Sequence, residues 1–196
     1  MSSLLLAALL AAPISSKAPQ QPISPGTQVQ AKDELSDAEV RQQVDGFLGA
    51  IDTPIRASQW QSLGPRALPI LQAIVKNPDE LPTQRAKAID GLGALGDKTS
   101  AALFARIANS ESEKINVRFA AVRGLAQVTA RPHAAQALRP FLEKSKDPRV
   151  RAVAAEQLAI RSQGKSCDLV RAQVERERSE TRSHYGRALK QCGVAQ

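Results

Sequence analysis

The sequence predicts an all-α protein in which antiparallel helix pairs stack on one another to form an α-solenoid. The main observation is a recurring skeleton: an Arg, a small or aromatic residue three positions later, and a Leu seven positions later. Four copies begin at intervals of 33, 33 and 31 residues, and self-similarity at such a period is typical of stacked repeat arrays. A weaker fifth copy begins at Arg41. The four copies start at Arg85, Arg118, Arg151 and Arg182.

The composition supports the same fold class. Hydrophobic residues make up 42% of the 196 residues, but aromatic residues make up only 3%. A core of Ala, Leu, Val and Ile suits closely packed helices better than a sheet, which favours aromatic and β-branched residues. We find no convincing run of the period-two alternation that is typical of strands.

The first predicted helix begins after Ser36, a candidate N-cap, and Glu39 three residues later completes a capping box. The helix is expected to end at Asp52-Thr53-Pro54, because the residue before a proline disfavours helical backbone. A short helix over residues 55–63 is expected to contain Trp60, the only tryptophan. The apolar stripe of the first helix has helical spacing and consists of Val40, Val44, Phe47, Leu48 and Ile51.

From residue 65 onwards the predicted helices come in pairs joined by short polar linkers. Proline lies at or near several helix starts, where its missing N–H costs little. Pro140 falls inside a predicted helix and is expected to kink it. The four pairs are residues 65–76 with 82–95, 99–109 with 113–128, 132–145 with 148–160, and 167–178 with 179–191.

The second helix of each pair carries an apolar stripe one position before the repeated Arg and three, four and seven positions after it. A single pair cannot cover this stripe, whereas stacked pairs bury it continuously, so stability comes largely from the interfaces between neighbours. The position six after the Arg is mostly small, which lets helices approach closely. The stripe of the second copy is Val117, Ala121, Val122 and Leu125, and the residues at the sixth position are Gly91, Gly124, Gln157 and Ala188.

Two of the second helices contain the pattern Val-Arg-x-x-Ala-x-x-x-Leu, starting at Val117-Arg118 and at Val150-Arg151. With these motifs, residues 36–192 resemble HEAT repeats, in particular the short HEAT-like class also found in phycobilisome lyases. The resemblance implies a right-handed α-solenoid whose second helices line a concave binding face.

In that family an Asp in the turn often pairs with the repeated Arg. Here Asp79 precedes Arg85 by six residues, but Ser112 and Ser145 take the corresponding places in the next two repeats. A continuous Asp–Arg ladder is therefore not expected in the middle repeats. We expect the repeated Arg residues to brace turns and neighbouring helices, the alternative being a basic stripe that grips an anion.

The expected binding residues lie beside the apolar stripe, mostly two and five positions after the repeated Arg, with an aromatic residue next to one of them. These side chains could line the concave face, and the alternative is an ordinary solvated surface. The candidates are Lys87, Asp90, Phe119, Arg123, Glu156, His184 and Arg187.

No residue pattern indicates catalysis, a metal or a cofactor. Residues 91–96 match GxGxxG, but the dinucleotide motif needs a preceding strand, and these glycines lie within and at the end of a predicted helix. His133 and His184 show no metal-ligand spacing, and two cysteines without a clustered His do not make a zinc site. The sequence therefore favours a protein without enzymatic activity or a small-molecule substrate.

Cys167 and Cys192 are the only cysteines. If the chain turns near residues 178–180, the last two helices run antiparallel and both cysteines meet at one end. In an exported protein a disulfide there would fasten the last helix pair, which has no following repeat to shield it. The alternative is a pair of buried thiols.

The chain is expected to divide into a leader over residues 1–16, a tether over residues 17–35, the repeat domain over residues 36–192 and a short tail over residues 193–196. The leader contains nine consecutive apolar residues, which fit the core of a secretory signal but are too short for a membrane-spanning helix of about 20 residues. The tether is rich in Pro, Ser and Gln, a composition typical of disorder. These features predict a periplasmic or secreted protein, or a cytoplasmic one if the leader is not a signal.

The net charge of +8 is unevenly spread. Residues 33–98 carry a net charge of −3 and residues 99–196 a net charge of +9, so the second half attracts anionic partners. The function that these observations favour is a non-enzymatic scaffold that binds another protein. The alternatives are a HEAT-like lyase or chaperone-type factor, and a nucleic-acid-binding solenoid, which export would nearly exclude.

Overall fold

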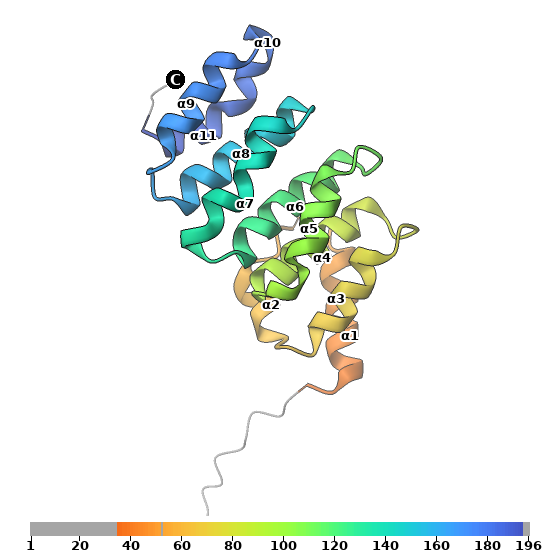
Figure 1. The fold of residues 1–196 in the computed structure, drawn as a ribbon. Helices are drawn as coiled ribbons and strands as arrows, with labels where there is room; N and C mark the ends of the chain where they lie inside the picture. The colour runs from red at the N-terminus through yellow and green to blue at the C-terminus, as the bar shows by residue number, and fades with distance from the viewer. Residues whose placement is uncertain (1–34, 52, 194–196) are drawn as a thin grey trace, which may run out of the picture. The chain divides into compact units, whose positions relative to one another are not determined.

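The computed structural model describes residues 35–51 and 53–193, and every regular element within these ranges is a helix (Figure 1). The described helices belong to a unit that begins at Leu35. The expected leader, nearly all of the expected tether and residues 194–196 lie outside the described residues. Within the described ranges, no helix combines the length and apolar character needed to cross a bilayer.

The helices follow the predicted order. The first two are α1 (Asp37–Gly49) and α2 (Ala57–Ser62). Three pairs follow: α3 (Ala67–Lys76) with α4 (Pro82–Ala94), α5 (Ala101–Asn109) with α6 (Ile115–Val128), and α7 (Arg131–Lys144) with α8 (Pro148–Arg161). A short 3-10 turn, η1 (Lys98–Ser100), precedes α5. The last pair consists of α9 (Cys167–Arg176), α10 (Ser179–Arg182), the 3-10 turn η2 (Ser183–Tyr185) and α11 (Gly186–Gln191).

The capping box at the start of α1 forms as predicted. The Glu39 N–H donates to Ser36 Oγ at 3.3 Å, and the Ser36 N–H donates to Glu39 Oε2 at 2.7 Å. The half-buried Phe47 packs edge-on against Trp60, with ring centroids 5.1 Å apart. The prediction that Ile51 belongs to the apolar stripe of this helix is wrong. Helix α1 ends at Gly49, and the Ile51 side chain is 83% exposed.

The second helices form a continuous layer in which α4 packs on α6, α6 on α8, and α8 on α11. Each first helix packs against the second helix of its own pair. Figure 1 shows the successive pairs following one another along the chain. The stripe predicted for the second copy is buried in this layer, as are Leu92 and Leu158 in the copies on either side.

Two glycines allow the second helices to approach their neighbours closely, as their position in the repeat predicts. A Cβ on Gly91 would lie 3.0 Å from the Trp60 ring. A Cβ on Gly124 would lie 2.8 Å from Ile89 and 3.0 Å from the Phe104 ring. Gly91 also belongs to the GxGxxG match, which falls in α4 and in the turn after it, where Gly96 has a φ of +72°.

Pro140 lies inside α7, as predicted, and α7 runs on to Lys144. One helix differs from the prediction. The helix predicted over residues 179–191 is instead divided at η2. This division places the fully buried Tyr185 ring in the core, with its hydroxyl donating to Glu177 at 2.5 Å.

The predicted disulfide is present. Cys167 at the start of α9 and Cys192 at the end of α11 are bonded, with their Cα atoms 5.6 Å apart. The disulfide therefore fastens α11 to α9 at the end of the described repeats.

Candidate binding groove

The repeated Arg residues are used inside the fold. Each donates to a backbone carbonyl at or near the end of the first helix in its own pair: Arg85 to Val75, Arg118 to Ala108, Arg151 to Ser145, and Arg182 to Glu175 and Glu177. The last carbonyls of a helix have no intrahelical partner, so these bonds satisfy otherwise unpaired acceptors. This arrangement agrees with the expected bracing role.

A partial acid–Arg ladder also exists, in a register that the family pattern did not predict. Arg85 contacts Glu113 of the following pair through two hydrogen bonds of 2.7 and 2.8 Å, and not Asp79 of its own pair. Arg118 forms no hydrogen bond or ion pair with an acid among the described residues; its charge makes only a small contribution to lowering the pKa of Asp147, which the Arg149 hydrogen bond lowers most. Where a direct contact forms, the acid comes from the pair that follows, so the contact links one repeat to the next.

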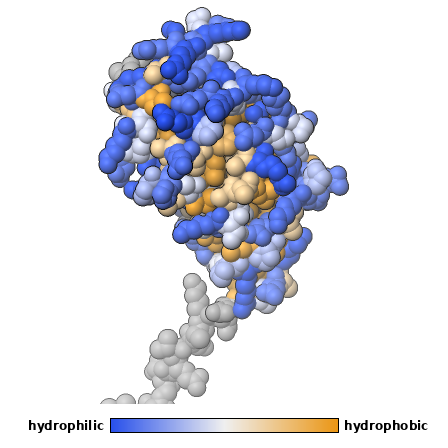
Figure 2. Space-filling view, viewed as in Figure 1, coloured by the Kyte–Doolittle hydropathy of each residue, from blue (hydrophilic) through white to orange (hydrophobic). Residues whose placement is uncertain are grey.

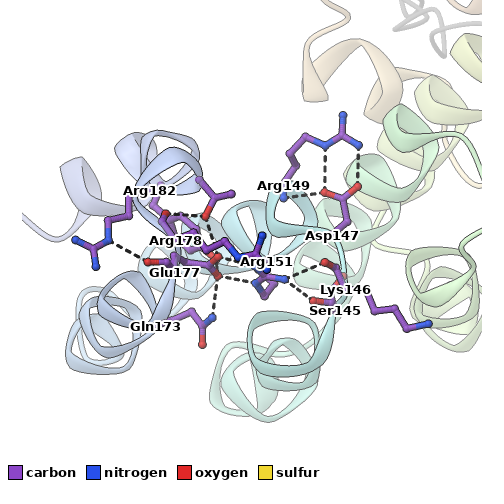
Figure 3. A network of polar contacts seen from close by, with 11 residues as sticks. Ser145, Lys146, Asp147, Arg149, Arg151, Gln173, Glu177, Arg178 and Arg182 are labelled. Atoms are coloured by element: carbon purple, nitrogen blue, oxygen red, sulfur yellow. Dashed lines mark hydrogen bonds and ion pairs between the residues drawn. The ribbon is translucent and has the colours of Figure 1, made fainter.

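The last step of the ladder is a buried network around Glu177 (Figure 3). Arg151 lies between the carbonyls of Ser145 and Lys146 and the carboxylate of Glu177, which it contacts at 2.6 and 2.5 Å. Gln173, Thr181 and Tyr185 also donate to this carboxylate. Only 3% of the Glu177 side chain is exposed, so the network holds the last pair against α8 from within the core.

The network shifts the pKa values of its members. Hydrogen bonds from Arg151, Tyr185 and Gln173 outweigh the effect of burial and lower the pKa of Glu177 from 4.5 to about 2. Burial and the Glu177 charge raise the pKa of Tyr185. At neutral pH the carboxylate is therefore ionised and the phenol is protonated, which is the state that the 2.5 Å hydrogen bond between them requires.

Beside this network, the surfaces of α6, α8, η2 and α11 enclose a groove of about 900 Å³. On the face seen in Figure 2, hydrophobic residues reach the surface in patches between hydrophilic ones. The groove lining comes from three consecutive repeats and consists of Phe119, Arg123, Arg149, Ala152, Val153, Glu156, Gln157, Ser183, His184, Gly186, Arg187 and Lys190.

The structure brings five of the seven candidate residues together in this groove, namely Phe119, Arg123, Glu156, His184 and Arg187. Asp90 lies at its edge, where it forms an ion pair with Arg123 at 2.9 Å. Lys87 lies elsewhere: it donates to the carbonyls of Leu48 and Ala50 near the end of α1 and lines a different cavity.

The prediction missed Arg149 and Lys190 among the charged lining residues. Arg149 precedes the repeated Arg151 by two positions, whereas the predicted binding residues all follow a repeated Arg. Lys190 lies one helical turn beyond Arg187, and this spacing on one helix face is the signal that would have identified it.

The charges in the groove divide into paired and unpaired groups. Arg123 is paired with Asp90, and Arg149 with Asp147 at 2.8 Å. In contrast, the side chains of Glu156, His184, Arg187 and Lys190 form no hydrogen bond or ion pair with other residues in the described part of the chain. Phe119, Ala152 and Val153 supply the apolar part of the lining. The groove therefore offers two cations, one carboxylate and an apolar surface to a ligand.

The groove lining contains a single carboxylate and therefore no carboxylate pair. Ser183, His184 and Glu156 all line it, but no hydrogen bond joins the side chains of these three described residues. Throughout residues 35–51 and 53–193, no three His, Cys, Asp or Glu side chains cluster in a way that could hold a metal ion. The open charges and the apolar side chains of the lining suit the groove for contact with a partner.

Comparison with known proteins identifies the repeats. A family model described as HEAT repeats matches residues 68–159 and 110–190, which together span most of the chain. No curated protein and no solved structure matches the sequence. With the repeat period, the stacked helix pairs and this match in agreement, the chain belongs to the HEAT repeat family.

Proposed function

We propose that this chain is a non-enzymatic scaffold that binds another protein through the groove between α6, α8 and α11. The observation that carries the proposal is the group of unpartnered charges in the groove. The other charged side chains on these three helices have intramolecular partners, whereas Glu156, Arg187 and Lys190 line the groove without one among the described residues. Membership of a family of stacked repeats supports the proposal, because such arrays present extended binding surfaces.

We also propose that the repeat domain works outside the cytoplasm. The disulfide between Cys167 and Cys192 supports this location, since structural disulfides are rare in reducing compartments. The apolar leader seen in the sequence supports it as well. Cell fractionation followed by thiol labelling tests the location: the proposal expects oxidised protein in the periplasmic or secreted fraction, and reduced protein in the cytoplasm would contradict it.

Site-specific photo-crosslinking in living cells tests the groove itself. A photoreactive residue replaces Ser183, an exposed groove residue, and in a matched control it replaces Ala102, an exposed residue on α5 that is not part of the groove. We expect a discrete protein adduct from position 183 and none from position 102. An absence of adducts at position 183, or the same adducts at both positions, would contradict the proposal.

A further inference from the structure

We infer that the groove binds a polypeptide segment of mixed charge. An acidic side chain of this segment meets Arg187 and Lys190 on α11, and a basic side chain meets Glu156 on α8. This inference rests on the proposed function and names the chemical class of the partner.

The repeats build a second ladder, made of charges that follow one another across the second helices. Asp90, Arg123, Glu156 and Arg187 all lie five positions after the repeated Arg, on α4, α6, α8 and α11 in turn. Their signs alternate. Asp90 and Arg123 satisfy each other with three hydrogen bonds of 2.9 to 3.3 Å. Glu156 and Arg187 have no ion-pair partner among the described residues, so this half of the ladder is open to a ligand.

The axes of packed helices lie about 8–10 Å apart, and α8 packs on α11. We infer a separation of this order between the points at which a bound segment meets Glu156 on one helix and the cations on the other. An extended chain advances about 3.3 Å per residue, so complementary side chains on a bound segment are about three residues apart. Phe119, Ala152 and Val153 form the apolar part of the lining, against which apolar side chains of the bound segment would pack.

The alternation of charge favours a polypeptide over a nucleic acid. A nucleic acid needs cations along a continuous phosphate backbone. Here Arg123 and Arg149 are already neutralised by Asp90 and Asp147, and the unpaired carboxylate of Glu156 would repel a phosphate. A polypeptide segment with both acidic and basic side chains can place an opposite charge beside each unpaired charge of the groove.

The probe is a displayed library of random peptides, selected on the purified, oxidised full chain and on three charge-reversal variants. Two variants change the groove, Arg187→Glu and Glu156→Arg. The matched control is Arg131→Glu on α7, an exposed Arg with no hydrogen bond or ion pair among the described residues. Circular dichroism checks that each variant is folded before selection.

We expect the full chain and the control to enrich peptides with an acidic and a basic residue about three positions apart. Selection on Arg187→Glu is expected to remove the acidic preference, and selection on Glu156→Arg the basic one. For one enriched peptide, Arg187→Glu weakens binding about tenfold, since reversal replaces one favourable ion pair with a repulsion. Replacing the acidic residue of the peptide with Lys restores binding to this variant.

Three outcomes would overturn the inference: no enrichment, enriched peptides whose charges do not respond to the groove reversals, or tighter groove-dependent binding of a single-stranded oligonucleotide than of any peptide. If photo-crosslinking gives an adduct at position 183 but the charges of the enriched peptides do not respond to the groove reversals, the scaffold function stands and only the mixed-charge partner is refuted. An absence of adducts in cells refutes the scaffold function independently of any library.

Discussion

Replacing Glu177 with Gln tests whether the buried network holds the last repeat in place. The change preserves the size of the side chain but removes the charge that Arg151 contacts at 2.6 and 2.5 Å. The pKa of Glu177 is lowered from 4.5 to about 2, and at about 1.4 kcal/mol per pH unit this shift corresponds to about 3 kcal/mol of folding free energy. We expect the variant to be less stable by about this amount at pH 7, in line with the cost of breaking a buried pair.

The pH dependence provides the more specific test. Because the pKa is lower in the folded state, Glu177 stabilises the fold fully above pH 4.5 and loses this contribution as the pH falls toward 2. Urea unfolding followed by circular dichroism at several pH values measures the difference in stability between wild type and Glu177→Gln. This difference is expected to shrink to about half by pH 3, because wild-type Glu177 becomes protonated while the variant has no group to titrate.

Glu175→Gln is the matched control, because Glu175 is an exposed carboxylate in the last turn of α9, two residues before Glu177. Its effect on the free energy of unfolding is expected to stay within about 0.5 kcal/mol. A Glu177→Gln difference that is the same at pH 7 and at pH 3 would refute the assignment of the network's stabilising effect to the ionised carboxylate.

Three further changes test the packing and the ends of the repeat array. Gly124→Ala is expected to destabilise the protein by about 1–3 kcal/mol, since the added Cβ would lie 2.8 Å from an isoleucine methyl. The matched control is Gly46→Ala, whose added Cβ would meet no atom within 4 Å, and it is expected to raise the melting temperature. Ser36→Ala removes the α1 cap and is expected to cost about 1 kcal/mol in denaturant unfolding, and an unchanged midpoint would contradict the cap's role. Reducing the Cys167–Cys192 disulfide is expected to lower the free energy of unfolding by about 3 kcal/mol and to speed amide exchange more in α11 than in α6. An equal increase in both helices would contradict the view that the disulfide holds α11 in place.

The fold could be predicted from the sequence because the repeat period and the apolar stripe both indicate stacked helix pairs. The Leu seven positions after a repeated Arg is expected to be buried if pairs stack. Leu92, Leu125 and Leu158 are buried, and Leu189 in the last pair is half-buried. The division of the last helix at η2 could not be predicted, because it depends on the buried contact between Tyr185 and Glu177, which only the packed structure brings together.

The groove could be predicted in part, for a similar reason. Positions on one face of successive second helices meet in space wherever the stacking is regular, which brings Arg123, Glu156 and Arg187 together. Lys87 lies outside the groove, because from α4 it donates to the Leu48 and Ala50 carbonyls near the end of α1, away from α8 and α11. The acidic partners of the repeated Arg85 and Arg151 were also not predicted, because these acids come from the following helix pair and not from the preceding turn.

Hydrogen–deuterium exchange of the full chain, with and without the partner recovered by crosslinking at position 183, tests the central claim most directly. The claim is that the protein works by contact through the groove built from the second helices. It predicts slower amide exchange on partner binding in α6, α8 and α11, with no change in α3, α5 and α7. Protection confined to the first helices, or a bound partner that leaves α8 and α11 unchanged, would contradict it.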